Sequence, residues 1–280
     1  MSTPDSVQMR AALADAAARF AFSPTARLDA ELLMAHALGI ERDRLLLDSA
    51  RAVPPGFAAL VARRAAHEPV AYITGMRGFW TIDLAVGPGA LVPRPDSEAL
   101  LIAAAAHVGA GAPATILDLG TGPGTLLLAA LDEWPGALGL GIDRSAVALS
   151  YARANAARLG MAGRARFVQG DWAAALAARF DLILANPPYI GTDEPLPDEV
   201  RAHEPASALF AGTDGLDDYR ILARQLPRLL AAGGCAAIEI GHTQASAVAA
   251  LFAAQALESS LHRDLGGRDR CLLVRAVAGT

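Results

Sequence analysis

The segment Asn186-Pro187-Pro188-Tyr189 follows the largely apolar run 180–185. Such a run is typical of a buried parallel strand, and the prolines end it because proline cannot continue a strand's hydrogen-bond ladder. In open α/β sheets, ligands bind at the carboxyl ends of the strands. An asparagine amide at that edge can hold a substrate nitrogen. The segment therefore predicts a substrate site, although a rigid strand-to-loop turn would also explain the two prolines.

A second segment, Asp118-Leu119-Gly120-Thr121-Gly122-Pro123-Gly124, follows another predicted strand and opens a helix. Its glycines permit a tight turn and let a ligand approach the backbone. The loop departs from the dinucleotide fingerprint, because Thr125 replaces the third glycine and Pro123 has no amide hydrogen to offer a pyrophosphate. Asp118 suits a cationic amino-acid group better than a phosphate. The alternative is a purely structural turn.

Acidic residues also end the next two predicted strands. Asp143 lies about 20 residues beyond the glycine loop, as expected of a carboxylate that binds ribose hydroxyls, but it could instead cap the helix that begins near Ser145. Asp171 could accept a hydrogen bond from an adenine amino group, and Trp172 could cover the adenine or simply pack. Together the strand ends describe a nucleoside with a positively charged, phosphate-free tail. S-adenosylmethionine fits this description and NAD does not.

Alternating strands and helices from residue 114 onward must position these side chains. Repeated βα units predict an α/β fold with a doubly wound, mostly parallel, seven-stranded sheet. The last two strands lack an intervening helix, which predicts a terminal hairpin with one antiparallel strand. A short helix is also expected over 173–178. The expected strands are 115–119, 138–142, 166–168, 180–185, 235–240, 257–264 and 271–277.

The sequence before this domain has a different pattern. Residues 1–73 are expected to form a small helical bundle, either a plain bundle or a module that recruits the substrate. Residues 74–92 are expected to form a β-hairpin linker whose strands come from the β-like runs 72–75 and 79–84. The domain with alternating strands and helices would then span 93–280.

Composition excludes several classes of protein. With 53% hydrophobic residues in 280, the chain can bury a sizeable core, and its apolar stretches are shorter than the roughly 20 residues of a membrane helix. Neither a disulfide nor a cysteine-based zinc site is expected from Cys235 and Cys271, and no metal site is predicted. The absence of a secretory signal predicts a cytoplasmic protein. A net charge of −5 and the absence of lysine argue against stable nucleic-acid binding.

The strand-end residues and Asn186-Pro187-Pro188-Tyr189 resemble the motifs of class I, S-adenosylmethionine-dependent methyltransferases that act on planar nitrogens. Further segments are similar to the peptide chain release factor N(5)-glutamine methyltransferases, over about Asp29 to the C-terminus. These segments are Glu68-Pro69-Val70-Ala71-Tyr72-Ile73-Thr74-Gly75, Phe79-Trp80, Val92-Pro93-Arg94-Pro95-Asp96-Ser97-Glu98, Glu204-Pro205 and Gly215-Leu216-Asp217.

The resemblance implies a Rossmann-like class I methyltransferase fold, with 93–280 as the S-adenosylmethionine-dependent methyltransferase domain. It also implies methyl transfer from S-adenosylmethionine to the glutamine of the Gly-Gly-Gln loop in class 1 release factors. It implies that 120–124, Asp143, Trp172 and Asn186 bind the cofactor and that 186–189 bind the glutamine side chain. Asn186, Pro187 and Tyr189 would be the catalytic residues. The chain departs from the family pattern at a few positions, which are Pro123, Thr125, His203 and the pair Asp96-Ser97.

Two related substrates stay open as alternatives. Methylation of a ribosomal-protein glutamine would use the same tetrapeptide, and so would an RNA or DNA exocyclic-amine methyltransferase. The nucleic-acid enzyme would need a basic groove, which the charge balance disfavours.

Overall fold

The computed structural model describes residues 4–47, 51–109 and 111–277. The outer ends of the first and last predicted domains, 1–3 and 278–280, therefore lie outside the described residues.

The chain divides into two compact units, each with its own hydrophobic core. The first combines the residues up to Met76 with a distant segment, Pro197–His203. The second holds Arg77–Leu196 and Glu204–Thr280. The position of a residue along the chain therefore does not decide its unit. Pro197–His203 belongs to the first unit, although residues 77–196 before it and 204–280 after it belong to the second.

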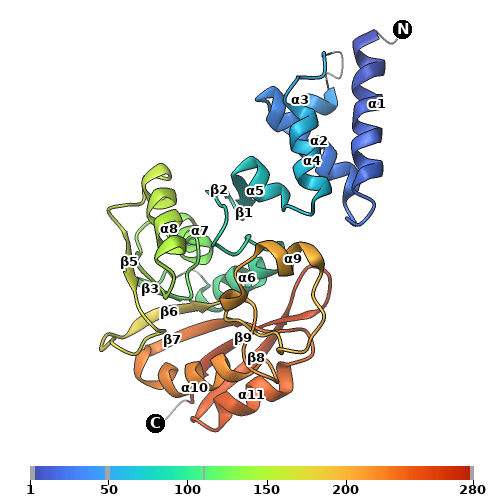
Figure 1. Ribbon diagram of the computed structural model, residues 1–280. Coiled ribbons are helices and arrows are strands. Elements are labelled where there is room, and N and C mark those ends of the chain that lie inside the picture. The colour runs from blue at the N-terminus through green and yellow to red at the C-terminus, as the bar shows by residue number, and fades with distance from the viewer. Residues whose placement is uncertain (1–3, 48–50, 110, 278–280) are drawn as a thin grey trace. The chain divides into compact units, whose positions relative to one another are not determined.

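The first unit, called the helical unit below, consists of short helices around a core that includes Met9, Phe20, Leu33 and Phe57. As the sequence predicts, a glycine ends the second helix. Gly39 has φ 64°, and its N–H donates to the last turn. The helices are α1 (Pro4–Arg19), α2 (Ala26–Leu38), α3 (Arg42–Leu47), α4 (Phe57–Ala65), α5 (Val70–Thr74) and α9 (Asp198–His203), shown in Figure 1.

The expectation that 72–75 forms a strand is wrong. Residues 72–74 belong to α5, which follows Pro69, and Gly75 is the C-cap of this helix with φ 75°. Tyr72 and Ile73 are buried, and Ile73 belongs to the core of the helical unit. Burial against that core outweighs the weak β-propensity of a Tyr-Ile-Thr run.

The predicted hairpin does form, slightly later in the chain. Strands β1 (Met76–Phe79) and β2 (Ile82–Ala85) make a two-stranded sheet. Trp80 lies in the tight turn between them with φ 56°.

The second unit contains a seven-stranded sheet in the order β5-β4-β3-β6-β7-β9-β8, which confirms the predicted fold class. Strands β3 to β7 pair with one another in parallel, whereas β9 runs antiparallel to both β7 and β8. The predicted terminal hairpin is therefore present. The strands are β3 (Thr115–Leu119), β4 (Leu138–Asp143), β5 (Ala165–Gln169), β6 (Phe180–Ala185), β7 (Leu230–Glu239), β8 (Leu257–Arg263) and β9 (Asp269–Ala276).

Helices cover both faces of this sheet. Figure 1 shows α10 and α11 on one side and α6, α7 and α8 on the other. Cys235 and Cys271 are buried in the sheet, and burial raises the pKa of the Cys235 thiol to about 11. The helices are α6 (Glu98–Val108), α7 (Thr125–Glu133), α8 (Ala146–Arg158), α10 (Asp217–Leu229) and α11 (Ala245–Ala253), with 3₁₀ turns at η1 (Pro95–Ser97) and η2 (Ala206–Ala208).

The expected helix over 173–178 is also wrong, because 173–175 form turns and 176–178 have no regular structure. Side chains of α10 bind the backbone at the start of this segment. Gln225 Oε1 accepts from the Ala173 N–H at 2.9 Å, and Arg228 donates to the Ala173 carbonyl at 2.6 Å. The segment thereby connects β5 to β6 without a helix.

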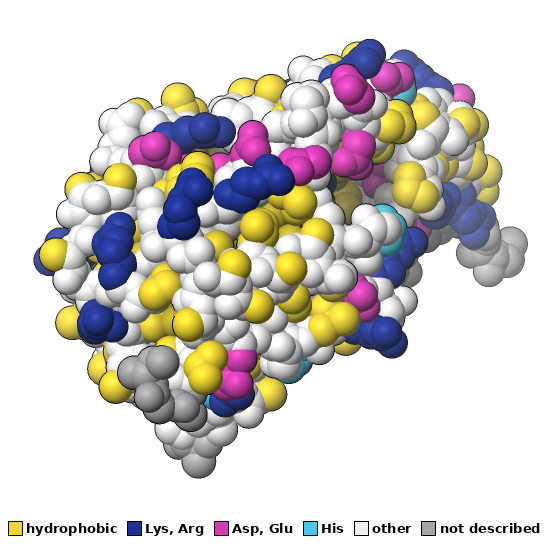
Figure 2. Space-filling model, turned by 90° about the horizontal axis from the view of Figure 1, so that it is seen from below, with side chains coloured by type: hydrophobic (Ala, Val, Ile, Leu, Met, Phe, Trp, Pro, Cys, Tyr) yellow, Lys and Arg dark blue, Asp and Glu magenta, His cyan; other side chains and the backbone are white. Residues whose placement is uncertain are grey.

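Within the described part of the chain, no helix is both long and apolar enough to cross a membrane. On the face drawn in Figure 2, several arginine side chains lie singly among apolar and uncharged side chains, and others lie beside acidic ones.

Candidate active site

A cavity opens in the second unit at the carboxyl ends of β3, β4, β5 and β6. Ten of the residues predicted for the site line it, which are Asp118, Gly120, Thr121, Gly122, Pro123, Asp143, Asp171, Trp172, Asn186 and Pro188. Gly124, Pro187 and Tyr189 lie outside this lining. The parallel register explains the convergence, because Asp118 pairs with Gly141 on β4 and with Leu184 on β6.

The glycine loop runs from the end of β3 to the start of α7. Gly120, Gly122 and Gly124 all have positive φ, at 72°, 56° and 88°, a region that only glycine enters without strain. A Cβ on Gly124 would lie 2.8 Å from the Leu128 Cδ1 atom, so this glycine also permits close packing of the loop on its helix.

Asp118 is the most buried acid of the cavity wall, at 1% exposure. Its Oδ2 atom accepts from the Thr121 hydroxyl at 2.6 Å and from the Leu127 N–H at 3.2 Å. Its Oδ1 atom has no hydrogen-bond partner among the described residues. Burial raises the pKa of this carboxyl to about 7, against the opposing effect of the two hydrogen bonds. An unpaired buried carboxylate oxygen on a cavity wall fits a cationic group.

Asp143 does not cap α8 itself, but its carboxylate binds the backbone next to that helix. Its Oδ1 atom accepts from the Ser145 N–H at 2.8 Å and its Oδ2 atom from the Gly122 N–H at 2.8 Å. Ser145 itself is the N-cap of α8, because its hydroxyl accepts from the Ala148 N–H. Asp143 therefore ties the glycine loop to the start of α8, and each oxygen can accept a further hydrogen bond.

Trp172 packs beside the glycine loop. A Cβ built on Gly120 would lie 3.4 Å from the Trp172 ring, and the indole N–H donates to Asp218 at 3.1 Å. The backbone of Trp172 has φ 47°, a costly conformation for a bulky residue. Asp171 beside it is exposed on the cavity wall. The half-buried indole thus forms a flat apolar surface on the cavity.

Asn186 directly follows β6 and is half-buried on the cavity wall. Its Nδ2 atom donates to the Ser97 hydroxyl at 3.1 Å, so Oδ1 is the amide atom not committed to that bond. Pro187 and Pro188 are buried. Tyr189 is held by its carbonyl, which accepts from Gln244 at 2.9 Å, and burial raises the pKa of its hydroxyl to about 12.

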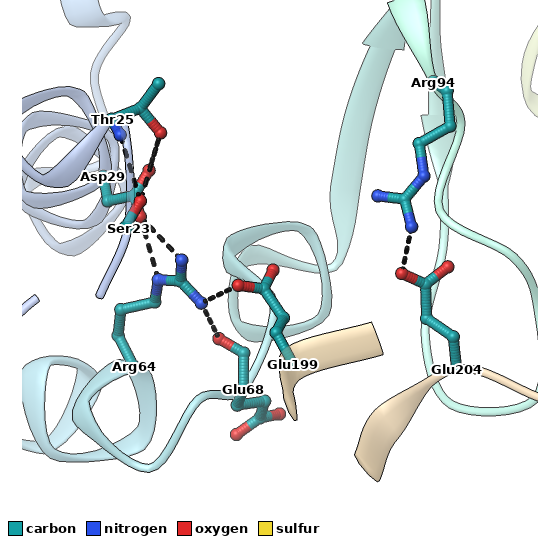
Figure 3. Close-up of polar contacts among 8 residues, drawn as sticks. All are labelled: Ser23, Thr25, Asp29, Arg64, Glu68, Arg94, Glu199 and Glu204. Carbon is teal, nitrogen blue, oxygen red and sulfur yellow. Dashed lines mark hydrogen bonds and ion pairs between the residues drawn. The ribbon is translucent and has the colours of Figure 1, made fainter. Parts of the chain in front are cut away.

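Four further residues of the cavity lining were assigned no role from the sequence, although they lie in segments that resembled the family. They are Val92, Arg94, Ser97 and Pro205. Glu204 links these segments, because the residue is 6% exposed and its side chain accepts from the Val92 N–H at 3.2 Å and from the Arg94 guanidinium (Figure 3). An acid-proline pair has no spacing signature that would reveal such a contact.

Two family models match the chain. One is described as the PrmC N-terminal domain and matches residues 11–75, and the other is described as a methyltransferase domain and matches residues 112–260. A solved structure, the 16S rRNA N2 G1207 methyltransferase of T. thermophilus in complex with AdoMet and guanosine, superposes with a TM-score of 0.51. It is 18% identical and covers 72% of this chain and 50% of that one, so it supports the fold alone.

The fold and the matching methyltransferase family model define a class I methyltransferase, and its cofactor is S-adenosylmethionine. Curated relatives narrow the class. The release factor glutamine methyltransferase of Rhodospirillum rubrum is 49% identical and covers 89% of this chain and 78% of its own length. That of Caulobacter vibrioides is 44% identical and covers 88% of both chains. The chain belongs to the release factor glutamine methyltransferase family.

Proposed function

We propose that this enzyme methylates the side-chain amide nitrogen of the glutamine in the Gly-Gly-Gln loop of class 1 peptide chain release factors. The observation that carries the proposal is the position of the Asn186 amide, which lies on the same cavity wall as Asp118 and Asp143. Its nitrogen is bound to Ser97, so its oxygen is available to accept a hydrogen bond from a substrate. The names of the relatives support the choice of a release factor.

The residues that would hold the cofactor are those that line the cavity. Asp118 Oδ1 suits the ammonium group of the methionine part, the free lone pairs of Asp143 suit ribose hydroxyls, and Asp171 with Trp172 suits the adenine. When bound, S-adenosylmethionine supplies an electrophilic methyl group. The buried Asp118 carboxylate gains most from this arrangement, because a cation removes the cost of its unpaired oxygen.

The substrate amide is a poor nucleophile, because its nitrogen lone pair is delocalised into the carbonyl. Asn186 Oδ1 would accept one N–H of this amide and the Pro187 carbonyl the other, which directs the lone pair toward the methyl donor. The buried prolines hold both acceptors rigid. Such positioning can contribute up to roughly 7–11 kcal/mol in ideal cases. The nitrogen becomes acidic only after alkylation, so the proton leaves without a dedicated basic side chain.

Tyr189 would contact the substrate amide with its ring, while its hydroxyl stays protonated because burial raises its pKa to about 12. The remaining predicted parts belong to the same proposal. The helical region 1–73 would recruit the release factor, 74–92 would link the domains, and 93–280 would carry out transfer in the cytoplasm.

The test is to incubate the protein with labelled S-adenosylmethionine and a purified release factor, with and without a Gln→Ala change in the Gly-Gly-Gln loop. Label should appear on the glutamine of the unchanged factor alone. Label on the altered factor, or on neither, would refute the proposal. A glutamine-bearing ribosomal protein and an RNA, each in a parallel reaction, separate the two alternatives.

Asn186→Ala should lower kcat at least about 100-fold, the loss typical when one preorganised hydrogen-bonding group is removed from an active site. Cofactor affinity, measured by calorimetry, should change much less because Asp118 and Asp143 are untouched. Turnover at the wild-type rate would contradict the role of Asn186.

A further inference from the structure

Asn186 and the buried Glu239 lie next to one another across two parallel strands. Ala185 on β6 pairs with Ile238 on β7, so one residue further along each strand are Asn186 and Glu239. Glu239 ends β7 and is 1% exposed. A carboxyl group is rarely buried to this extent without a specific reason, and the methyl transfer proposed above gives Glu239 no role.

Ser97 connects these two side chains. It is 2% exposed and occupies the N-cap position of α6, where its hydroxyl would ordinarily accept from a backbone N–H of the helix. Here the hydroxyl makes no such cap bond. It accepts instead from Asn186 Nδ2 at 3.1 Å, and its interaction with the neighbouring Glu239 carboxyl lowers the pKa of that group. Glu239 Oε2 has no hydrogen-bond partner within the described chain.

The direction of these hydrogen bonds decides which end of the Asn186 amide faces the cavity. A hydroxyl has one proton to donate, and a carboxylate can only accept. Ser97 therefore gives its proton to Glu239 and can offer Asn186 only a lone pair. The amide must then turn its nitrogen toward Ser97, which leaves the oxygen for the substrate N–H. Without the carboxylate, Ser97 could donate to Asn186 Oδ1 and the amide could face the cavity with its NH₂ group, which cannot accept.

We propose that Ser97 and Glu239 are positioning residues that fix the Asn186 amide with its oxygen toward the substrate. This inference rests on the proposed methylation of a glutamine amide, and it adds the device that gives the acceptor its orientation. It is the same logic by which a carboxylate behind a metal-binding or catalytic histidine fixes the tautomer of the ring.

The ionisation of Glu239 gives the proposal a signature in pH. Burial raises the pKa of Glu239 to about 7, while the Ser97 hydrogen bond, Arg270 and Arg94 act to lower it and Asp96 acts to raise it. The other titratable groups that face it are Tyr189 after β6, Tyr219 on α10 and Cys271 on β9, and each has a raised pKa. They stay neutral near pH 7, so Glu239 is the group of this cluster that titrates there.

Below about pH 7 a protonated Glu239 can donate to Ser97, and the polarity of the chain of hydrogen bonds is lost. At saturating cofactor and substrate, the kcat of the wild type should fall as the pH decreases from 8 to 6. The Asp118 carboxyl also has a pKa raised to about 7, but its protonation should weaken cofactor binding rather than turnover. Measuring kcat at saturating cofactor therefore separates the effect of Glu239 from that of Asp118.

The experiment compares Ser97→Ala and Glu239→Gln with the wild type. Each should lower kcat at least about tenfold, with cofactor Kd within about twofold, and the fall of kcat toward pH 6 should be absent in Glu239→Gln. Ser97→Thr keeps the hydroxyl and should restore most of the activity lost in Ser97→Ala. Glu258→Gln is the matched control, because Glu258 forms an exposed ion pair with Arg275 at the sheet edge and should leave kcat unchanged.

A second measurement does not depend on turnover. The side-chain amide signals of Asn186 in a ¹⁵N NMR spectrum, identified by their loss in Asn186→Ala, should shift between pH 6 and 8 in the wild type and stay constant in Glu239→Gln. Ser97→Ala should give the same constant signals if Glu239→Gln does not fold. Wild-type kcat in Ser97→Ala, or identical NMR titrations with and without Glu239, would overturn the proposal. Absence of label on the release factor with a normal NMR titration would refute the proposed substrate instead.

Discussion

Asp118 is the residue at which cofactor binding and protonation are most directly coupled. Its pKa is raised to about 7 because the carboxyl is buried, and only its ionised form can neutralise an ammonium group. Affinity for S-adenosylmethionine should therefore rise with pH, by about five- to tenfold between pH 6 and 7.5, as the ionised fraction increases. Calorimetry at several pH values measures this, and Asp118→Asn should bind more weakly with a flatter profile. Equal affinity of the two proteins at pH 7.5 would contradict the role of Asp118.

Single residues were predictable where topology alone brings them together. Parallel strands share a carboxyl edge, so the order of strands along the chain is enough to expect Asp118, Asp143 and Asn186 near one cavity. Ser97 and Glu239 could not be expected there, because their contact requires β7 to lie beside β6 and the start of α6 to reach the same point. A glutamate at the end of the apolar run 235–240 was the one local sign.

At the scale of the elements, the glycine loop and α7 form the tightest junction of the site. Gly124→Ala would place an alanine at a backbone φ of 88°. Its Cβ atom would lie 2.8 Å from the Leu128 side chain and 3.5 Å from the Ala152 backbone. We expect the free energy of unfolding to fall by about 2–4 kcal/mol, since backbone strain and overpacking add. Gly122→Ala is the control, because φ is 56° but nothing lies within 4 Å. It should cost about 1–2 kcal/mol. Urea unfolding compares the two, and equal losses would show that packing on Leu128 contributes nothing.

Regular elements with strong periodicity were predicted well, and short ones were not. The seven strands follow from apolar runs, and the antiparallel direction of β9 follows from the lack of a helix between it and β8. The strand expected over 72–75 and the helix expected over 173–178 failed, because their conformation depends on partners elsewhere. The core of the helical unit buries Ile73, and the Gln225 and Arg228 side chains bind the backbone of Ala173. No window of a few residues contains that information.

At the scale of the whole molecule, the chain returns to its first unit late in the sequence. Arg64, which is 3% exposed, binds Asp29 at 2.8 Å and Glu199 at 2.8 Å, and it also donates to the Glu68 carbonyl at 3.1 Å (Figure 3). Glu199 lies on α9, 135 residues further along the chain. A buried arginine such as Arg64 needs acidic partners. The sequence does not reveal that one of them, Glu199, comes from a segment that follows strand β6.

Arg64→Ala tests whether this arginine holds α9 in the helical unit. It would leave Asp29, 6% exposed, without its cation, and breaking a buried ion pair from one side costs about 3–5 kcal/mol. Native-state hydrogen exchange should show that loss across the helical unit and a larger loss of protection in α9. The neighbouring Arg63→Ala removes an ion pair with Glu68 whose side chains are 45% and 21% exposed, so it should cost under about 1 kcal/mol and leave α9 protected. Unchanged exchange in α9 of Arg64→Ala would show that packing, and not the Arg64–Glu199 pair, holds this helix.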